Sequence, residues 1–97
     1  MYVYILFSAG RDKFYIGETS DVAVRLNQHR TGYFKSSSTA GMSDWALVLV
    51  IDCGDRTKAR QVETFLKRQR NRDFLTRFIH NESYRKKLLT ERFGILG

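Results

Sequence analysis

Apolar residues in the first half of the chain form short stretches that are typical of strands. Tyr2 to Phe7 is apolar and rich in strand-forming residues, and the turn-forming stretch 8–12 follows it. Phe14 to Glu18 predicts a second strand, so that the two segments form a β-hairpin. An apolar run with β-branched residues, Trp45 to Cys53, predicts a third strand that is buried.

Helical patterns occupy most of the remaining chain. Thr19, Ser20 and Asp21 can cap a helix that runs to about Arg30 and is closed by Gly32. Residues 33–44 are rich in Ser, Thr and Gly, and are expected to be a loop. Further helices are predicted after a cap at Asp55 to about Arg70, around the apolar repeat at 74–79, and over 84–93.

These elements predict an α+β fold in the order β-β-α-β-α-α. It would be a small three-stranded, mostly antiparallel sheet flanked by helices. The length of 97 residues allows one domain with one modest core. We assign residues 1–80 to this domain and residues 81–97 to a basic C-terminal helical extension of it.

Charge is distributed unevenly along the chain. The net charge is +7, and residues 56–97 hold 12 Lys and Arg against four acidic residues. A basic half on a globular domain is typical of a protein with a polyanionic partner such as nucleic acid, although it also suits an ordinary solvated surface. No stretch approaches the roughly 20 apolar residues of a membrane span. The single cysteine, Cys53, excludes an intrachain disulfide, and we expect a cytoplasmic protein without a membrane partner.

The first predicted helix carries two basic residues beside its apolar stripe. Val22 and Leu26 define this stripe, and Arg25 and His29, four residues apart, lie at its border. Side by side, they can converge on one small anion, and the planar Arg side chain can bond two phosphate oxygens together. The structural alternative is that both side chains only line the edge of the core.

The second predicted helix carries a carboxylate in a comparable place. Glu63 lies beside the apolar stripe formed by Ala59, Val62 and Leu66. A carboxylate at such a border must be paired, hydrogen-bonded or bound to a cation. Glu63 could therefore pair with Arg25 or bind a metal, and one carboxylate suits Mg²⁺, which keeps several waters and binds substrate phosphate.

The hairpin contains a paired motif, Val3-Tyr4-Ile5 and Tyr15-Ile16-Gly17. After it come Glu18-Thr19-Ser20-Asp21, Arg25-Leu26 and His29, and later Ala59-Arg60, Glu63 and Leu66-Lys67. These elements, in this order over residues 2 to about 79, resemble the GIY-YIG nuclease superfamily and its small stand-alone bacterial branch. The first element has Val3 where the family name has glycine, whereas the second matches fully.

The resemblance implies an active site of five residues. Tyr4 and Tyr15 match the two motif tyrosines, Arg25 the helix arginine, His29 the histidine of some branches, and Glu63 the metal-binding glutamate. It also implies a single Mg²⁺ or Mn²⁺ ion held by Glu63. Each residue has an ordinary structural explanation too, since tyrosines are common in strands and glycine permits close backbone contacts.

The implied reaction is hydrolysis of a phosphodiester. Arg25 would neutralise the phosphate, and the attacking water would lose its proton to a tyrosine. We favour Tyr4 for this role, with His29 receiving or relaying the proton and Tyr15 positioning the water or phosphate. A free tyrosine has a pKa near 10, so nearby cations would have to lower it.

Two family features have no clear counterpart. Some members carry an asparagine after the glutamate, and Asn71 and Asn81 are the candidates here. Some place a lysine beside the second motif tyrosine, where this chain has Phe14, with Lys13 one step further away. These departures affect the details of the implied mechanism more than the implied class of protein, a nuclease.

Basic residues in the second half would bind the nucleic-acid backbone, which gives affinity but little base specificity. The expected DNA-binding residues are Lys35 in the Ser-rich loop and the cluster Lys67, Arg68, Arg70 and Arg72, with Arg85, Lys86 and Lys87 further on.

The predicted function is therefore a metal-dependent endonuclease that cuts duplex or branched DNA. We expect structure-selective or weakly sequence-selective cutting, because no sequence-reading module is recognisable. The main alternative is a catalytically silent nucleic-acid-binding module that acts with a partner protein. A small basic protein that docks onto another protein and an RNA substrate are further alternatives.

Overall fold

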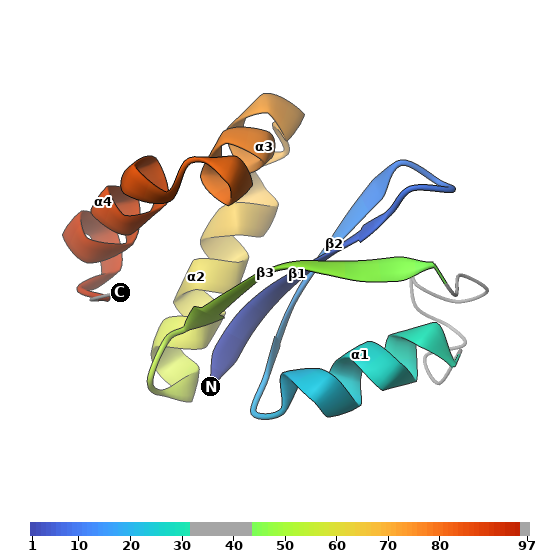
Figure 1. Cartoon of the computed structure of the whole chain (residues 1–97). Helices are drawn as coiled ribbons and strands as arrows, with labels where there is room; N and C mark the ends of the chain where they lie inside the picture. Colours follow the sequence, from blue (N-terminus) through green and yellow to red (C-terminus); the bar gives the residue numbers. More distant parts are fainter. Residues whose placement is uncertain (32–43, 96–97) are drawn as a thin grey trace.

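The computed structural model describes residues 1–31 and 44–95. Within these ranges the chain forms an α+β fold, as predicted, and the fourth helix is present (Figure 1). The elements are β1 (Tyr2–Ser8), β2 (Lys13–Thr19), α1 (Val22–Arg30), β3 (Trp45–Asp52), α2 (Arg56–Gln69), α3 (Arg72–His80) and α4 (Glu82–Phe93). None of the described helices is long and apolar enough to cross a membrane.

The strands of the described residues form one antiparallel sheet in the order β2-β1-β3. The hairpin register places Tyr4 opposite Gly17 and Leu6 opposite Tyr15. Since side chains alternate between the two faces of a strand, these residues share one face of the sheet. The hairpin therefore brings both motif tyrosines to the same side.

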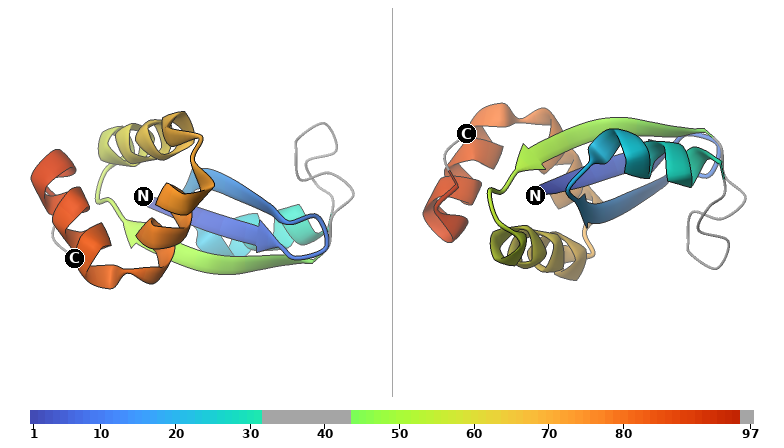
Figure 2. Two further views of the ribbon diagram at one scale, coloured as in Figure 1. Left: turned by 90° about the horizontal axis from the view of Figure 1, so that it is seen from above. Right: turned by 90° about the horizontal axis from the view of Figure 1, so that it is seen from below.

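The central strand β1 is buried on both faces, and helices cover the two faces differently. Val3 and Ile5 face the main core, which α2, α3 and α4 complete. On the opposite face Tyr4 and Leu6 pack with Trp45 and with the apolar side of α1. Figure 2 shows α1 across one face of the sheet and the other helices toward the opposite face.

Strand β3 differs from its prediction as a buried strand. It pairs with β1 alone and forms an edge of the sheet, and its register shifts opposite Ile5 and Leu6. Leu47, Val48 and Val50 are exposed, while only the two ends of the strand contribute buried residues to the cores. An apolar run gives the strand but not its position in the sheet, and the irregular register is a common feature of edge strands.

Side-chain caps define where the helices begin. Asp21 and Asp55 accept backbone hydrogen bonds at the starts of α1 and α2, as their sequence positions predict. Asn71 and Asn81 do the same at the starts of α3 and α4. The two asparagines that were candidates for the family's active-site asparagine are thus capping residues. Arg85 donates to two carbonyl groups at the end of α3, which makes it a structural residue.

Candidate active site

The core of the site is a buried hydrogen bond between β1 and α1. Tyr4 projects from the central strand and is 2% exposed, and His29, in the last turn of α1, is 1% exposed. The Tyr4 hydroxyl lies 2.9 Å from His29 Nε2. This bond joins two residues that are 25 positions apart. The sequence predicted one on a strand and the other on a helix, but it did not predict their contact.

Gly17 makes room for this arrangement. A Cβ atom at this position would lie 2.6 Å from the Tyr4 hydroxyl and 3.0 Å from a ring carbon of Tyr15. Real Cβ contacts are almost never closer than 3.0 Å. The glycine is therefore required by the close approach of the Tyr4 phenol to β2, rather than by an unusual backbone angle.

Tyr15 completes an aromatic group around His29. The ring centroids of Tyr15 and His29 are 4.6 Å apart, and those of Tyr15 and Tyr4 are 6.2 Å apart. Trp45 contacts the edge of the Tyr15 ring at 6.3 Å. Tyr15 is half-buried, so it lies between the buried Tyr4–His29 pair and the surface.

Opposite charges reach this aromatic group from two helices. Arg25 on α1 acts electrostatically on both Tyr4 and His29, and Glu63 on α2 acts on Tyr4. Tyr4 therefore interacts with each of the other four residues expected from the sequence, although α1 and α2 are far apart in the chain.

Glu63 forms an ion pair that the sequence analysis did not identify. Lys67 Nζ lies 2.7 Å from Glu63 Oε1, and the Glu63 side chain is 20% exposed. The two residues are four apart on α2, with the glutamate first, which is the favourable order for a helical ion pair. This spacing is the signal from which the pair could have been predicted.

Burial raises the pKa of Tyr4 well above its ordinary value. The neighbouring Tyr15 and the negative charge of Glu63 raise this pKa further, whereas Arg25 acts in the opposite direction. Arg25 lowers the Tyr4 pKa as expected of a nearby cation, but burial has the larger effect and the pKa is raised overall. Tyr4 holds its proton, and we assign it as the donor in the hydrogen bond to His29.

The pKa of His29 is shifted the other way. Burial lowers it below the ordinary histidine value, and the positive charge of Arg25 lowers it further. His29 is accordingly neutral at pH 7, with Nε2 able to accept the Tyr4 proton.

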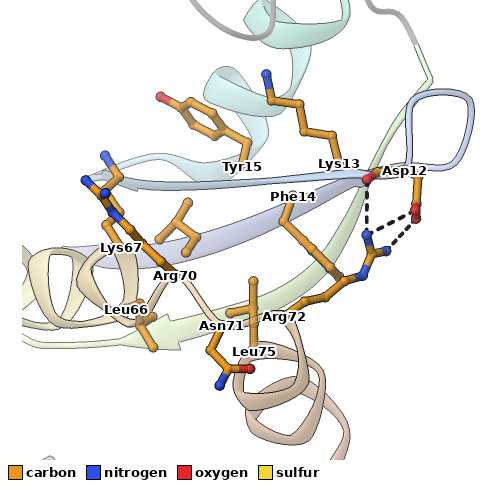
Figure 3. A pocket seen from close by; sticks show the side chains of 11 residues that line it. Asp12, Lys13, Phe14, Tyr15, Leu66, Lys67, Arg70, Asn71, Arg72 and Leu75 are labelled. Carbon is orange, nitrogen blue, oxygen red and sulfur yellow. Dashed lines mark hydrogen bonds and ion pairs between the residues drawn. The ribbon is translucent and has the colours of Figure 1, made fainter.

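Two hollows flank the site on the side of α2. One, of about 520 Å³, follows the free edge of β2, and Tyr15, Lys67 and Arg70 are among its lining residues. In Figure 3, Tyr15 and Lys13 extend to one side of β2 and Phe14 to the other. A second hollow is lined by Glu63, Thr64, Lys67, Arg68 and Arg70. Lys67 and Arg70 line both hollows, so the carboxylate of Glu63 lies among basic side chains.

The expected DNA-binding residues differ in their contacts. Arg72 binds both carboxylate oxygens of Asp12 and holds the hairpin turn to the start of α3 (Figure 3). Lys67 is paired with Glu63. Arg68 and Arg70 form no ion pair with the described residues and line the second hollow. Lys35 lies outside the described residues.

A divalent cation would be bound here with help from water and substrate. The described residues contain no group of three or more His, Cys, Asp or Glu that could bind a metal ion. Glu63 supplies one partly exposed carboxylate at an open hollow. Such a donor set does not suit Ca²⁺, which needs many protein oxygens, but it fits Mg²⁺ bound by one carboxylate, waters and substrate phosphate.

The fold and site define a small α+β domain with two tyrosines on a hairpin, an arginine and a histidine on the next helix and a glutamate on the helix after the third strand. The model of the GIY-YIG catalytic domain matches residues 1–77. The chain therefore belongs to the GIY-YIG family, a family of nucleases. Comparisons with curated proteins and with solved structures gave no match.

We predict that Gly17→Ala destabilises the protein through its contact with Tyr4. The added methyl group must displace the phenol, and overpacking of this kind costs about 1–3 kcal/mol. Denaturant unfolding of the variant measures this loss. The same substitution in a Tyr4→Leu background should cost clearly less, because the colliding ring is gone. An equal cost in both backgrounds would show that the Tyr4 ring is not the constraint.

We also predict that stability depends on pH through His29. The unfolded chain protonates this histidine near its ordinary pKa of about 6.5, whereas burial lowers the pKa in the folded protein. The stability present above pH 6.5 is therefore lost as the pH falls toward the folded pKa, by at most about 1.4 kcal/mol per pH unit.

Unfolding free energies of the wild type and His29→Gln between pH 7.5 and pH 5 measure this effect. The variant should lose less stability over this interval than the wild type. His80→Gln, which changes the exposed histidine on α3, is the matched control and should follow the wild type. If His29→Gln loses as much stability over this interval as the wild type, His29 is not a buried neutral histidine.

Proposed function

We propose that this protein is a divalent-metal-dependent endonuclease that hydrolyses phosphodiester bonds of DNA. The observation that carries the proposal is the convergence of the Tyr4–His29 hydrogen bond, Tyr15, Arg25 and Glu63 beside an open basic surface. Membership of the GIY-YIG family supports nuclease chemistry, and it favours DNA over RNA.

Arg25 is the residue we assign to the scissile phosphate. Its guanidinium carries a permanent charge and can donate two parallel hydrogen bonds to phosphate oxygens. It lies on α1 close enough to act on Tyr4 and His29. Charge that develops on the phosphate during attack would therefore form next to the residues that handle the proton.

Proton transfer in this proposal uses Tyr4 and His29 as a relay. Because Tyr4 is neutral, it cannot act as a preformed phenolate base. Its hydroxyl can, however, accept a proton from the attacking water while passing its own proton to Nε2 of His29 over the 2.9 Å hydrogen bond. Tyr15, which is closer to the surface, would position the water or the phosphate.

Glu63 is the proposed ligand of a single Mg²⁺ or Mn²⁺ ion. When bound, the ion supplies Lewis acidity to the phosphate and to the departing oxygen. Lys67 binds Oε1 of Glu63 in this structure, so a cation that takes this oxygen would displace the ammonium group. Its ammonium group could then contact a substrate phosphate, which would link binding of the cation to binding of DNA.

The surrounding basic residues support affinity more than sequence choice. Arg70 lines the second hollow with Glu63, where it could contact a phosphate next to the cut, and Arg68 at the outer part of this hollow could contact phosphates farther from it. Phosphate contacts carry no direct base information. We therefore propose structure-selective or weakly sequence-selective cutting of duplex or branched DNA.

Cleavage of supercoiled plasmid and of an end-labelled branched duplex tests the proposal. Both are incubated with Mg²⁺, Mn²⁺ or a chelator. We expect nicking that requires the metal and that falls at least about 100-fold in Glu63→Gln, since even loss of an outer-sphere group costs about 10–100-fold in metal sites. The variant should retain DNA binding and fold.

Glu82→Gln is the matched control. Glu82 pairs with Lys86 four residues later on α4, as Glu63 pairs with Lys67 on α2. Removing this carboxylate should leave cleavage unchanged. Cleavage by Glu63→Gln at the rate of the wild type would refute the assignment of the metal ligand. Metal-independent binding without any cleavage by the wild type would instead favour a silent binding module.

A further inference from the structure

A third basic hollow lies between α2 and α4, away from the tyrosines. It has a volume of about 450 Å³, and its charged lining residues are Arg60, Arg68 and Arg92. None of the described residues that line it carries a carboxylate. Helix α4 lies beyond residues 1–77, which match the family model, so Arg92 comes from a part of the chain outside that match.

The three arginines are held in different ways. Arg60 is partly neutralised by Glu18, whose Oε1 lies 3.2 Å from its Nε. The Cζ atom of Arg92 lies over the Phe65 ring, 4.3 Å from its centroid, and this cation–π contact holds the guanidinium against α2. Arg68 forms no ion pair with the described residues. Arg68 and Arg92 are therefore the two arginines whose charge is available in the hollow.

This hollow adjoins the surface around Glu63. Thr64 and Arg68 line both the third hollow and the second one, which contains Glu63. Successive residues of a helix are about 100° apart, so Thr64 and Arg68 lie on the outer face of α2, between the Glu63 side and the α4 side. One basic surface thus extends from the candidate metal ligand over α2 to Arg92.

We propose that Arg92, on the far side of α2 from the cut, and Arg68, on the outer face of α2, bind the phosphate backbone of the second strand of a substrate duplex. This inference rests on the proposed function. An α-helix is about 10–12 Å across, and the major groove of B-DNA is about 12 Å wide. Phosphates at Glu63 and at the α4 hollow would then lie on opposite walls of one groove, with α2 between them.

An acidic peptide is the alternative occupant, and the lining residues favour DNA over it. Two aromatic rings line the hollow, and both already make contacts within the protein: Arg92 covers Phe65, and Phe93 packs against Phe65 with the ring centroids 5.6 Å apart. Planar guanidinium groups suit phosphate, and the hollow is continuous with the surface that binds the scissile phosphate in the proposed function. Glu91 lines an adjacent hollow with Phe65 and Arg92 and would border the DNA rather than contact it.

The test measures how duplex binding depends on salt. Binding of a fluorescent DNA duplex is followed by anisotropy over a range of salt concentrations, in the Glu63→Gln background so that no cleavage occurs. Each phosphate contact contributes about 0.9 to the slope of log Kd against log salt. We expect Arg68→Gln and Arg92→Gln each to reduce the slope by about this amount, with a weaker effect on a single strand.

Two further variants separate the contact from folding and from general charge. Arg77→Gln removes the same charge from the exposed face of α3, where this arginine lies over the Tyr84 ring, and should leave the slope unchanged. Arg92→Lys keeps the charge but not the guanidinium group over Phe65, and should retain most of the slope of the unsubstituted Arg92 protein. Thermal unfolding confirms that each variant is folded at the temperature of the assay.

The outcomes are separable from those of the proposed function. An unchanged slope in Arg92→Gln, or an equal reduction in Arg77→Gln, would overturn the inference even if cleavage by the wild type requires metal. An equal reduction on duplex and single strand would overturn the placement of α2 between two strands. If the slopes are as expected but the wild type never cleaves DNA, the binding surface is supported and the proposed nuclease activity is refuted.

Discussion

The buried hydrogen bond between Tyr4 and His29 is the interaction on which the site depends. It ties α1 to the central strand, and it requires Gly17 on the neighbouring strand because no side chain fits beside the phenol. Once α1 is fixed in this way, Arg25 one turn earlier is brought to the same place. Packing on this face of the sheet therefore also aligns the chemistry, and the net worth of the bond itself, about 1 kcal/mol, is the smaller part of its role.

Charge balance around Glu63 is the second constraint. In a chain with a net charge of +7, this carboxylate faces a surface of lysine and arginine, and Lys67 neutralises it. The same surroundings attract phosphate. In the proposed function, a substrate phosphate would bring a second negative charge, and Lys67 could exchange Glu63 for this phosphate. The open hollow around Glu63 allows this exchange.

Much of the fold could be predicted from local patterns, because strands, helices and aspartate caps depend on neighbouring residues. The edge position of β3 could not, since an apolar run does not reveal its partners in a sheet. Resemblance supplied the residues of the site, but the contact between Tyr4 and His29 and its effect on their pKa values depend on tertiary burial. The ion pair of Lys67 with Glu63 could have been predicted from their spacing of four residues. Asn71 and Asn81 had two possible roles in the sequence, a catalytic one and a capping one, and only the structure shows that both are caps.

The most direct test is to locate the site at which a divalent cation binds to the protein. Titration of ¹⁵N-labelled protein with Mn²⁺ broadens the amide signals closest to the ion. We expect the amide signals around Gly17 and Glu63 to broaden first. In Glu63→Gln this broadening should be absent, while the rest of the spectrum is unchanged. Broadening centred elsewhere, for example at the exposed Asp73 on α3, or broadening at Gly17 that persists in Glu63→Gln, would contradict the proposed metal-binding role of Glu63.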